Sequence, residues 1–175
     1  DPYALETAHV SVITFDSSAR QAVPLTDLLS FQMPALTASG TTSLGEALTL
    51  TASSIAKEVQ KTTADTKGDW RPLVFLMTDG SPNDDWRKGL NDFKAARTGV
   101  VVACAAGHDA DTSVLKEITE IVVQLDTADS STIKAFFKWV SASISVGSQK
   151  VESSKKEVIG LEDLPPPPPE VNVVL

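Results

Sequence analysis

The sequence predicts an α/β fold in which a doubly wound, mainly parallel sheet carries helices on both faces. Unbroken apolar runs at residues 73–77 and 100–105 are typical of parallel strands that are covered on both faces. Segments with apolar residues at helical spacing separate these runs. The chain has 175 residues, of which 42% are apolar, and this is enough for the core of one ordinary domain.

The N-terminal part predicts two strands after the end of a helix in residues 1–8. Residues 9–15 are rich in β-branched side chains, which favours a strand, and residues 16–18 read as a turn. Residues 21–25 predict a short edge strand, because Pro24 cannot donate a hydrogen bond to a central ladder.

The first long helix is predicted from apolar residues at helical spacing, which are Leu44, Leu48, Ile55 and Val59. Ser43 and Glu46 have the spacing of a capping box at its start. A second helix is predicted from Trp86, Leu90 and Phe93, with Asp84 and Asp85 favouring its N-terminus.

The C-terminal half continues the alternation. Val114, Leu115 and Ile118 predict a short helix that Asp111 could cap, and residues 121–125 predict a strand. The last helix is predicted from five apolar residues, which are Ile133, Phe136, Phe137, Val140 and Ile144.

A domain boundary is predicted after Gly147. Residues 1–147 form the domain, and residues 148–175 form a polar, Pro-rich C-terminal tail. The run Pro165 to Pro169 favours polyproline II, which cannot join a sheet. Apolar residues after it could dock the tail, and these are Val171, Val173, Val174 and Leu175.

Charge and composition argue against some classes of binding partner and indicate a cellular compartment. The net charge of −8 argues against nucleic acid and anionic membrane surfaces as partners, because phosphate binding needs a basic patch. No apolar run approaches the roughly 20 residues that a membrane span needs. The single cysteine, Cys104, fits a reducing compartment, and we expect the chain to be cytoplasmic.

Two segments place oxygen donors where a parallel sheet binds ligands. Asp79 directly follows an apolar strand, and residues 40–45 lie at the start of a helix whose N-terminus can face the same sheet edge. A hydroxyl and a carboxylate together suit a hard divalent cation such as Mg²⁺. Helix capping by Thr42 or Ser43 is the alternative reading of the hydroxyls, and a solvated turn is the alternative for Asp79.

These segments resemble parts of the metal-ion-dependent adhesion site of the von Willebrand factor A (vWA) domain superfamily. The second part of that site, a threonine in a Gly-rich loop, resembles residues 40–48, with Thr42 as the ligand and Thr41 as the alternative. The third part, the aspartate of a T-D-G turn, resembles Asp79. The resemblance covers roughly residues 3–147 and implies a vWA, Rossmann-like fold.

The first part of the family site, a D-x-S-x-S loop after the first strand, has no counterpart in a suitable position. Residues 16–18 and 129–131 have the wrong spacing. The resemblance therefore implies a domain truncated at its N-terminus, with a βα unit of roughly 30–40 residues expected upstream. The metal site is accordingly incomplete within residues 1–175.

The resemblance implies a metal-dependent protein-binding module and not an enzyme. Mg²⁺ or Mn²⁺ would be held by Thr42 and Asp79, and a protein partner would offer a carboxylate to the cation. Residues 70–73 and the Pro-rich C-terminus look most like TerY of bacterial tellurite-resistance systems. That similarity implies a stress-response role beside a protein kinase and a PP2C-type phosphatase.

Two other functions stay open. The chain could be a metal-independent scaffold or interaction domain. It could also be a Mg-dependent, phosphatase-like enzyme whose catalytic residues lie upstream. The sequence argues against other enzyme classes, because it contains neither a P-loop nor a G-x-S-x-G nucleophile elbow.

Overall fold

The fold is that of a computed structural model, which describes residues 2–37, 39–107, 110–154, 156–158 and 160–174. The chain divides into two compact units. The hairpin unit comprises Pro2–Pro72 and Pro82–Arg97, and the sheet unit comprises Leu73–Ser81 and Thr98–Leu175. Each unit is therefore built from two separate stretches of the sequence.

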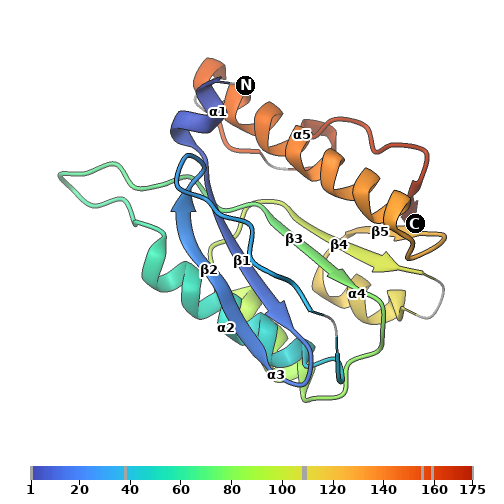
Figure 1. Ribbon diagram of the computed structural model, residues 1–175. Coiled ribbons are helices and arrows are strands. Elements are labelled where there is room, and N and C mark those ends of the chain that lie inside the picture. Colours follow the sequence, from blue (N-terminus) through green and yellow to red (C-terminus); the bar gives the residue numbers. More distant parts are fainter. Residues whose placement is uncertain (1, 38, 108–109, 155, 159, 175) are drawn as a thin grey trace. The chain divides into compact units, whose positions relative to one another are not determined.

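The hairpin unit contains two antiparallel strands with three helices (Figure 1). Its elements are α1 (Pro2–Thr7), β1 (His9–Phe15), β2 (Ala19–Asp27), α2 (Leu44–Glu58) and α3 (Trp86–Ala95). The expected strand at residues 9–15 is confirmed, whereas β2 is longer than the expected residues 21–25.

Pro24 lies where the pairing of β1 with β2 is irregular. Val12 pairs with Val23 and Val10 with Thr26, so the ladder shifts register around the proline. The neighbouring Leu25 N–H instead donates to a carboxylate oxygen of Glu58, at 2.8 Å. A side chain of α2 thus satisfies a backbone donor at the bulge in β2.

Helices α2 and α3 pack closely through two glycines. A Cβ on Gly45 would lie 2.7 Å from the Cα of Trp86, and a Cβ on Gly89 would overlap the carbonyl oxygen of Gly45. The buried side chains of the two helices lie beside this contact, and they are Leu44, Ala47, Leu48, Trp86, Leu90 and Phe93. Glycine is required at the crossing because the backbones touch.

The sheet unit contains a four-stranded mixed sheet in the order β3-β4-β5-β6. Its strands are β3 (Val74–Thr78), β4 (Val101–Ala106), β5 (Ile121–Leu125) and β6 (Val171–Val174), and its helices are α4 (Thr112–Ile118), α5 (Ser130–Ser154) and the 3-10 turn η1 (Leu161–Asp163). The first three strands are parallel, and β6 is antiparallel to β5. The expected mainly parallel α/β sheet is confirmed.

Alternate residues of the sheet pack on opposite sides. Val102, Cys104 and Ala106 of β4 join a cluster with Phe136 and Trp139 of α5. Figure 1 shows α5 on one side of the sheet and α4 on the other. The apolar runs of the sequence therefore reflect burial on both faces.

The apolar run at residues 73–77 forms most of β3, and the position of this strand in the sheet does not follow from the run itself. Among the described residues, β3 pairs only with β4 and lies at the edge of the four-stranded sheet. Its apolar side chains are half-buried, whereas Val102 to Ala105 of β4 are completely buried. An apolar run indicates that both faces of a strand are covered, but it does not indicate whether other strands pair with it on both edges.

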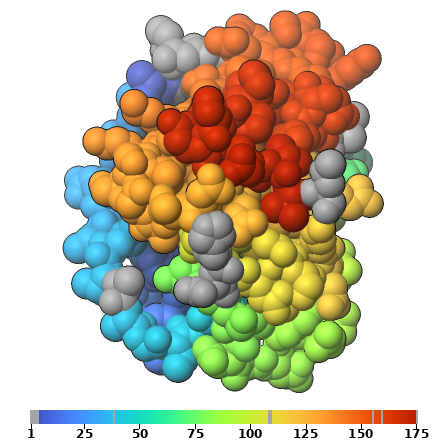
Figure 2. All heavy atoms as spheres, turned by 90° about the vertical axis from the view of Figure 1, so that its right-hand side faces the viewer, coloured from blue at the N-terminus to red at the C-terminus, as the bar shows by residue number. Residues whose placement is uncertain are grey.

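The chain beyond Gly147 is part of the sheet unit, so the boundary predicted at this glycine is wrong, whereas the docking expected of the last apolar residues is confirmed for Val171. Helix α5 continues through Gly147 to Ser154, and β6 extends the sheet after the prolines. The Trp139 indole N–H donates to the carbonyl of Pro165, at 2.7 Å. Figure 2 shows the C-terminal residues, in red, lying beside the orange residues of α5. Three of their side chains enter the core, which are Val158, Leu164 and Val171.

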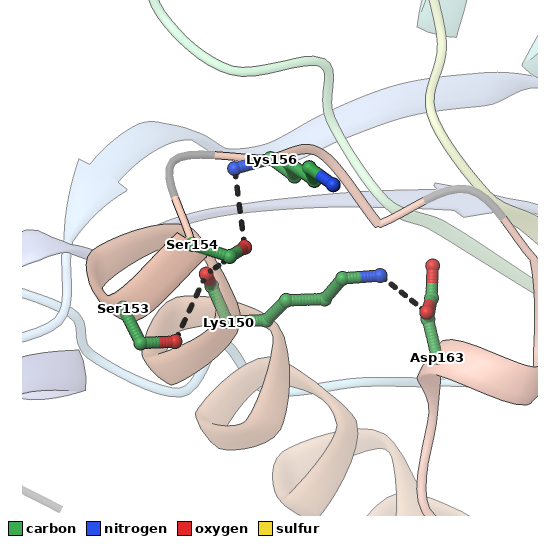
Figure 3. Close-up of polar contacts among 5 residues, drawn as sticks. All are labelled: Lys150, Ser153, Ser154, Lys156 and Asp163. Atoms are coloured by element: carbon green, nitrogen blue, oxygen red, sulfur yellow. Dashed lines mark hydrogen bonds and ion pairs between the residues drawn. The ribbon is translucent and has the colours of Figure 1, made fainter.

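Helix α5 ends in a group of serine contacts (Figure 3). The hydroxyls of Ser153 and Ser154 both donate to the carbonyl of Lys150, at 3.3 and 2.7 Å. The Ser154 hydroxyl oxygen also accepts the Lys156 N–H, at 3.3 Å. The Lys150 ammonium forms an ion pair with Asp163 of η1. These contacts satisfy the last turn of α5 and fasten the returning chain to it.

Candidate functional site

Asp79 lies at the carboxyl end of β3 in a compact turn of the sheet unit. The buried Thr78 hydroxyl donates to the Gly80 carbonyl at 3.3 Å and accepts the Gly80 N–H at 3.4 Å. The Asp79 side chain is exposed, and within the described residues its carboxylate has no hydrogen bond or ion pair. The turn therefore presents an uncommitted carboxylate at the strand end, where the sequence predicted it.

The loop that carries Thr42 is fastened to the β1–β2 turn of the hairpin unit. The Ser43 N–H donates to the Asp16 carbonyl at 2.8 Å, and the Thr41 N–H donates to the Ser17 hydroxyl at 3.3 Å. Gly40 has a φ of +85°, and a Cβ there would overlap the Ser17 hydroxyl. Glycine is thus needed for both the backbone conformation and the close approach.

Asn83 holds the backbone of Thr42 from both sides. The Thr42 N–H donates to the Asn83 side-chain oxygen at 2.6 Å, and the Asn83 N–H donates to the Thr42 carbonyl at 2.9 Å. The Thr42 side chain is half-buried, and in the part of the chain that is described its hydroxyl makes no hydrogen bond. The backbone of Thr42 is fixed while its hydroxyl stays available.

Asp84 caps α2, which corrects two expectations. Its carboxylate accepts the N–H groups of Gly45 at 3.0 Å and Glu46 at 2.9 Å. Ser43 is the N-cap residue of α2, but its side chain makes no capping hydrogen bond, so the capping box predicted with Glu46 is not formed. Asp84 was expected at the start of α3, yet the N-cap of α3 is Asp85, whose side chain makes no capping bond. The two oxygens of the Asp84 carboxylate each accept one N–H group at the start of α2, where the helix leaves its first amides without partners.

Thr42 and Asp79 belong to different units, Thr42 to the hairpin unit and Asp79 to the sheet unit. Each has the expected local setting, and their joint binding of a cation stays a prediction. Across the described ranges no group of three or more His, Cys, Asp or Glu side chains could hold a metal ion. Asn83 and Asp84 are the residues at these loops whose roles the sequence did not reveal.

Other polar candidates have structural roles. Asp111 caps α4 as predicted, accepting the N–H groups of Ser113 and Val114. The hydroxyls of Ser131 and Thr127, with two backbone N–H groups, hold the pKa of Asp129 well below its usual range at the start of α5. The apparent D-S-S segment at 129–131 is thus a helix cap.

Cys104 is completely buried in β4, and this burial raises the pKa of its thiol to about 12. In this environment the thiol is an inert part of the core. His108, for which the sequence favours a solvated loop, lies outside the described residues. None of the helices in the described ranges is long and apolar enough to span a bilayer.

Comparison with known proteins supports the predicted fold. The family model of the von Willebrand factor type A domain matches residues 4–138. The crystal structure of the conserved hypothetical protein BatB from Bacteroides thetaiotaomicron is similar, with a TM-score of 0.52 and 19% sequence identity over 87% of this chain and 82% of that chain. No curated protein matches the sequence. At this identity the structural similarity concerns the fold alone.

Proposed function

Because the chain belongs to the von Willebrand factor type A domain family, we propose that it is a protein-binding module whose binding depends on Mg²⁺ or Mn²⁺. We further propose that it has no catalytic activity of its own. The observation that carries the proposal is the pair of oxygen donors that make no hydrogen bond in the described structure, the Thr42 hydroxyl and the Asp79 carboxylate. Both lie in loops whose backbones are held by other residues.

The chemistry of these donors fits a hard cation. Mg²⁺ and Mn²⁺ prefer oxygen ligands, and Mg²⁺ keeps several waters when a protein supplies few groups. Thr42 and Asp79 supply one neutral hydroxyl and one carboxylate, which alone would hold Mg²⁺ weakly against bulk water. In this proposal the serines of a D-x-S-x-S loop, contributed from upstream of residue 1, supply further contacts. The bound cation would then act as a Lewis acid that accepts a carboxylate of the partner.

The proposed biological setting is a cytoplasmic stress-response module of the bacterial tellurite-resistance type. The similarity to TerY at residues 70–73 and in the Pro-rich C-terminal segment supports this setting. Partners in it would include a protein kinase and a PP2C-type phosphatase. The net charge of −8 supports a protein partner over nucleic acid, since a net negative charge disfavours binding to phosphates.

The test is calorimetric titration of MnCl₂ and MgCl₂ into the full-length protein, including any residues encoded upstream of residue 1. Asp79→Ala should abolish binding, because it removes the only charged donor of the pair. Asp65→Ala is the matched control, since Asp65 is an exposed loop carboxylate without a proposed role. Equal affinities of the wild type and Asp79→Ala would place any cation elsewhere and overturn the proposed site.

A further inference from the structure

The segment that follows the T-D-G turn holds the Thr42 loop at two successive residues. Asn83 binds both backbone polar groups of Thr42: its side-chain oxygen accepts the Thr42 N–H at 2.6 Å, and its N–H donates to the Thr42 carbonyl at 2.9 Å. Asp84 takes the N–H groups of Gly45 and Glu46 at the start of α2. All of these residues belong to the hairpin unit. The side chain and backbone N–H of Asn83 therefore hold the backbone of Thr42, and the Asp84 side chain holds the start of α2 that follows it.

We propose that Asn83 and Asp84 are positioning residues for the cation site, which set the affinity of Thr42 for Mg²⁺ or Mn²⁺ without contacting the ion. This inference rests on the proposed function. Neither residue corresponds to the threonine or the aspartate of the family site. Their hydrogen bonds to the Thr42 loop are what assigns them this role.

Asn83 acts on the orientation of the Thr42 hydroxyl. With the N–H and the carbonyl of Thr42 both bound, the peptide groups on either side of its Cα are fixed. The hydroxyl can then move only by rotation about χ1, which is stiff in a β-branched residue. A neutral hydroxyl is a weak ligand, and Mg²⁺ demands nearly octahedral geometry, so a loosely held donor would contribute little.

Asp84 adds an electrostatic contribution. The first N–H groups of a helix carry a partial positive charge, which is unfavourable beside a cation. The Asp84 carboxylate accepts hydrogen bonds from two of these N–H groups, those of Gly45 and Glu46, and its negative charge offsets their partial positive charge. Its replacement by asparagine keeps an oxygen acceptor but removes the negative charge, so this substitution isolates the electrostatic part.

The segment that carries these residues also carries the charged ligand. Three residues separate Asp79 from Asn83 in the sequence, and Asp84 follows directly. One short stretch thus supplies the carboxylate ligand and both residues that hold the other ligand. Changes of backbone conformation in this stretch should alter the affinity for the cation.

The experiment measures Mn²⁺ affinity by calorimetry in the full-length protein and in Asn83→Ala and Asp84→Asn. Loss of groups that orient metal ligands typically weakens affinity about 10- to 100-fold, and we expect losses in this range for both variants. A second readout needs no metal. In the metal-free protein, the amides of Gly45 and Glu46 should exchange with solvent faster in Asp84→Asn than in the wild type.

Glu58→Gln is the matched control. Like Asp84, Glu58 is a residue of the hairpin unit whose carboxylate accepts a backbone N–H, that of Leu25. The Glu58 carboxylate also accepts hydrogen bonds from the side-chain amide of Gln21. Glu58 is the last residue of α2, whereas Asp84 binds backbone N–H groups in the first turn of that helix. Its substitution should lower the melting temperature and leave Mn²⁺ affinity unchanged.

The possible outcomes separate this inference from the proposed function. If Asp79→Ala abolishes Mn²⁺ binding while Asn83→Ala and Asp84→Asn bind like the wild type, the positioning role is overturned and the proposed function stands. Equal loss of affinity in Glu58→Gln and Asp84→Asn would show a general effect of instability and would also overturn it. If Asp79→Ala binds normally, both fail. Asn83 is exposed, so Asn83→Ala keeps the test valid even if Asp84→Asn does not fold.

Discussion

Replacement of Gly89 by alanine tests the contact between α2 and α3 most directly. The new Cβ would lie 2.7 Å from the carbonyl carbon and the Cα of Gly45, and closer still to its carbonyl oxygen. These are backbone atoms of α2, so no change of rotamer can relieve the overlap and one helix must move. Overpacking of this kind typically costs about 1–3 kcal/mol, and we expect the upper end of that range.

Helix propensity works in the opposite direction. Alanine is favoured over glycine inside a helix by about 1 kcal/mol, and Gly89 lies within α3. Subtraction leaves a net loss of about 2 kcal/mol in the free energy of unfolding. For a chain of this size, that loss lowers the melting temperature by about 4–8 °C. Thermal and urea unfolding followed by circular dichroism would measure both quantities.

Gly147→Ala is the control for this prediction. A Cβ on Gly147 would lie 3.3 Å from a methyl carbon of Val158 and 3.6 Å from one of Leu73. Both neighbours are ends of side chains that can adjust, so the propensity gain should offset the small strain to within about 1 kcal/mol. A Gly89→Ala protein as stable as the wild type, or as Gly147→Ala, would refute the close backbone contact.

Three further predictions concern the sheet unit. Leu164→Ala should lower the free energy of unfolding by about 2–4 kcal/mol in urea titrations, because Leu164 is buried beyond α5; no loss would mean that this segment does not pack. Hydrogen bonds lower the folded pKa of Asp129 below its ordinary value of 3.8, so the carboxylate stabilises the fold above that pH and this stabilisation is lost as the pH falls through the folded pKa. On acidification the melting temperature of Asp129→Asn should therefore fall less steeply than that of the wild type, and equal slopes would contradict this. The pKa of about 12 for the buried Cys104 thiol predicts that iodoacetamide modifies it at about pH 8 only after unfolding, which mass spectrometry would measure. Rapid labelling of Cys104 in the native protein would be inconsistent with its burial.

Local patterns predicted most elements of this fold. The strands at residues 101–106 and 121–125 followed from apolar runs, and the cap at Asp111 followed from its place before a helix. These features depend on neighbours in the sequence, so they can be read from it. The edge position of β3 depends on which strands pair with it, and the run at residues 74–77 does not encode that.

The extension of α5 and the strand character of β6 were not predicted, although docking of the last apolar residues was. Gly147 suggested a helix end, but it lies inside α5 where the helix approaches Val158. Strand β6 has four residues and follows a run of prolines, so its periodicity is too short to be informative. Its place in the sheet is defined by pairing with β5, from Leu125 with Val171 to Val122 with Val174.

The candidate site was predicted in part. Thr42 and Asp79 occupy the loop and the strand end that their motifs indicated. The roles of Asn83 and Asp84 were not apparent, because their partners lie 41 and 39 residues away in the sequence. Short motifs can identify donors for a ligand, whereas the groups that hold those donors come from the tertiary fold.

The insertion of β3 between the two stretches of the hairpin unit has a consequence for protein synthesis. All residues of the hairpin unit have been made once Arg97 is added, whereas the partner strand β4 ends at Ala106. The ribosome must add 28 residues (106 minus 78) after Thr78 before that partner is complete. At about 5–20 residues per second this takes roughly 1.4 to 5.6 s. During that interval the apolar segment 74–77 has been made but β4, its partner in the described sheet, is still incomplete, and exposed apolar segments of this kind are what chaperones bind.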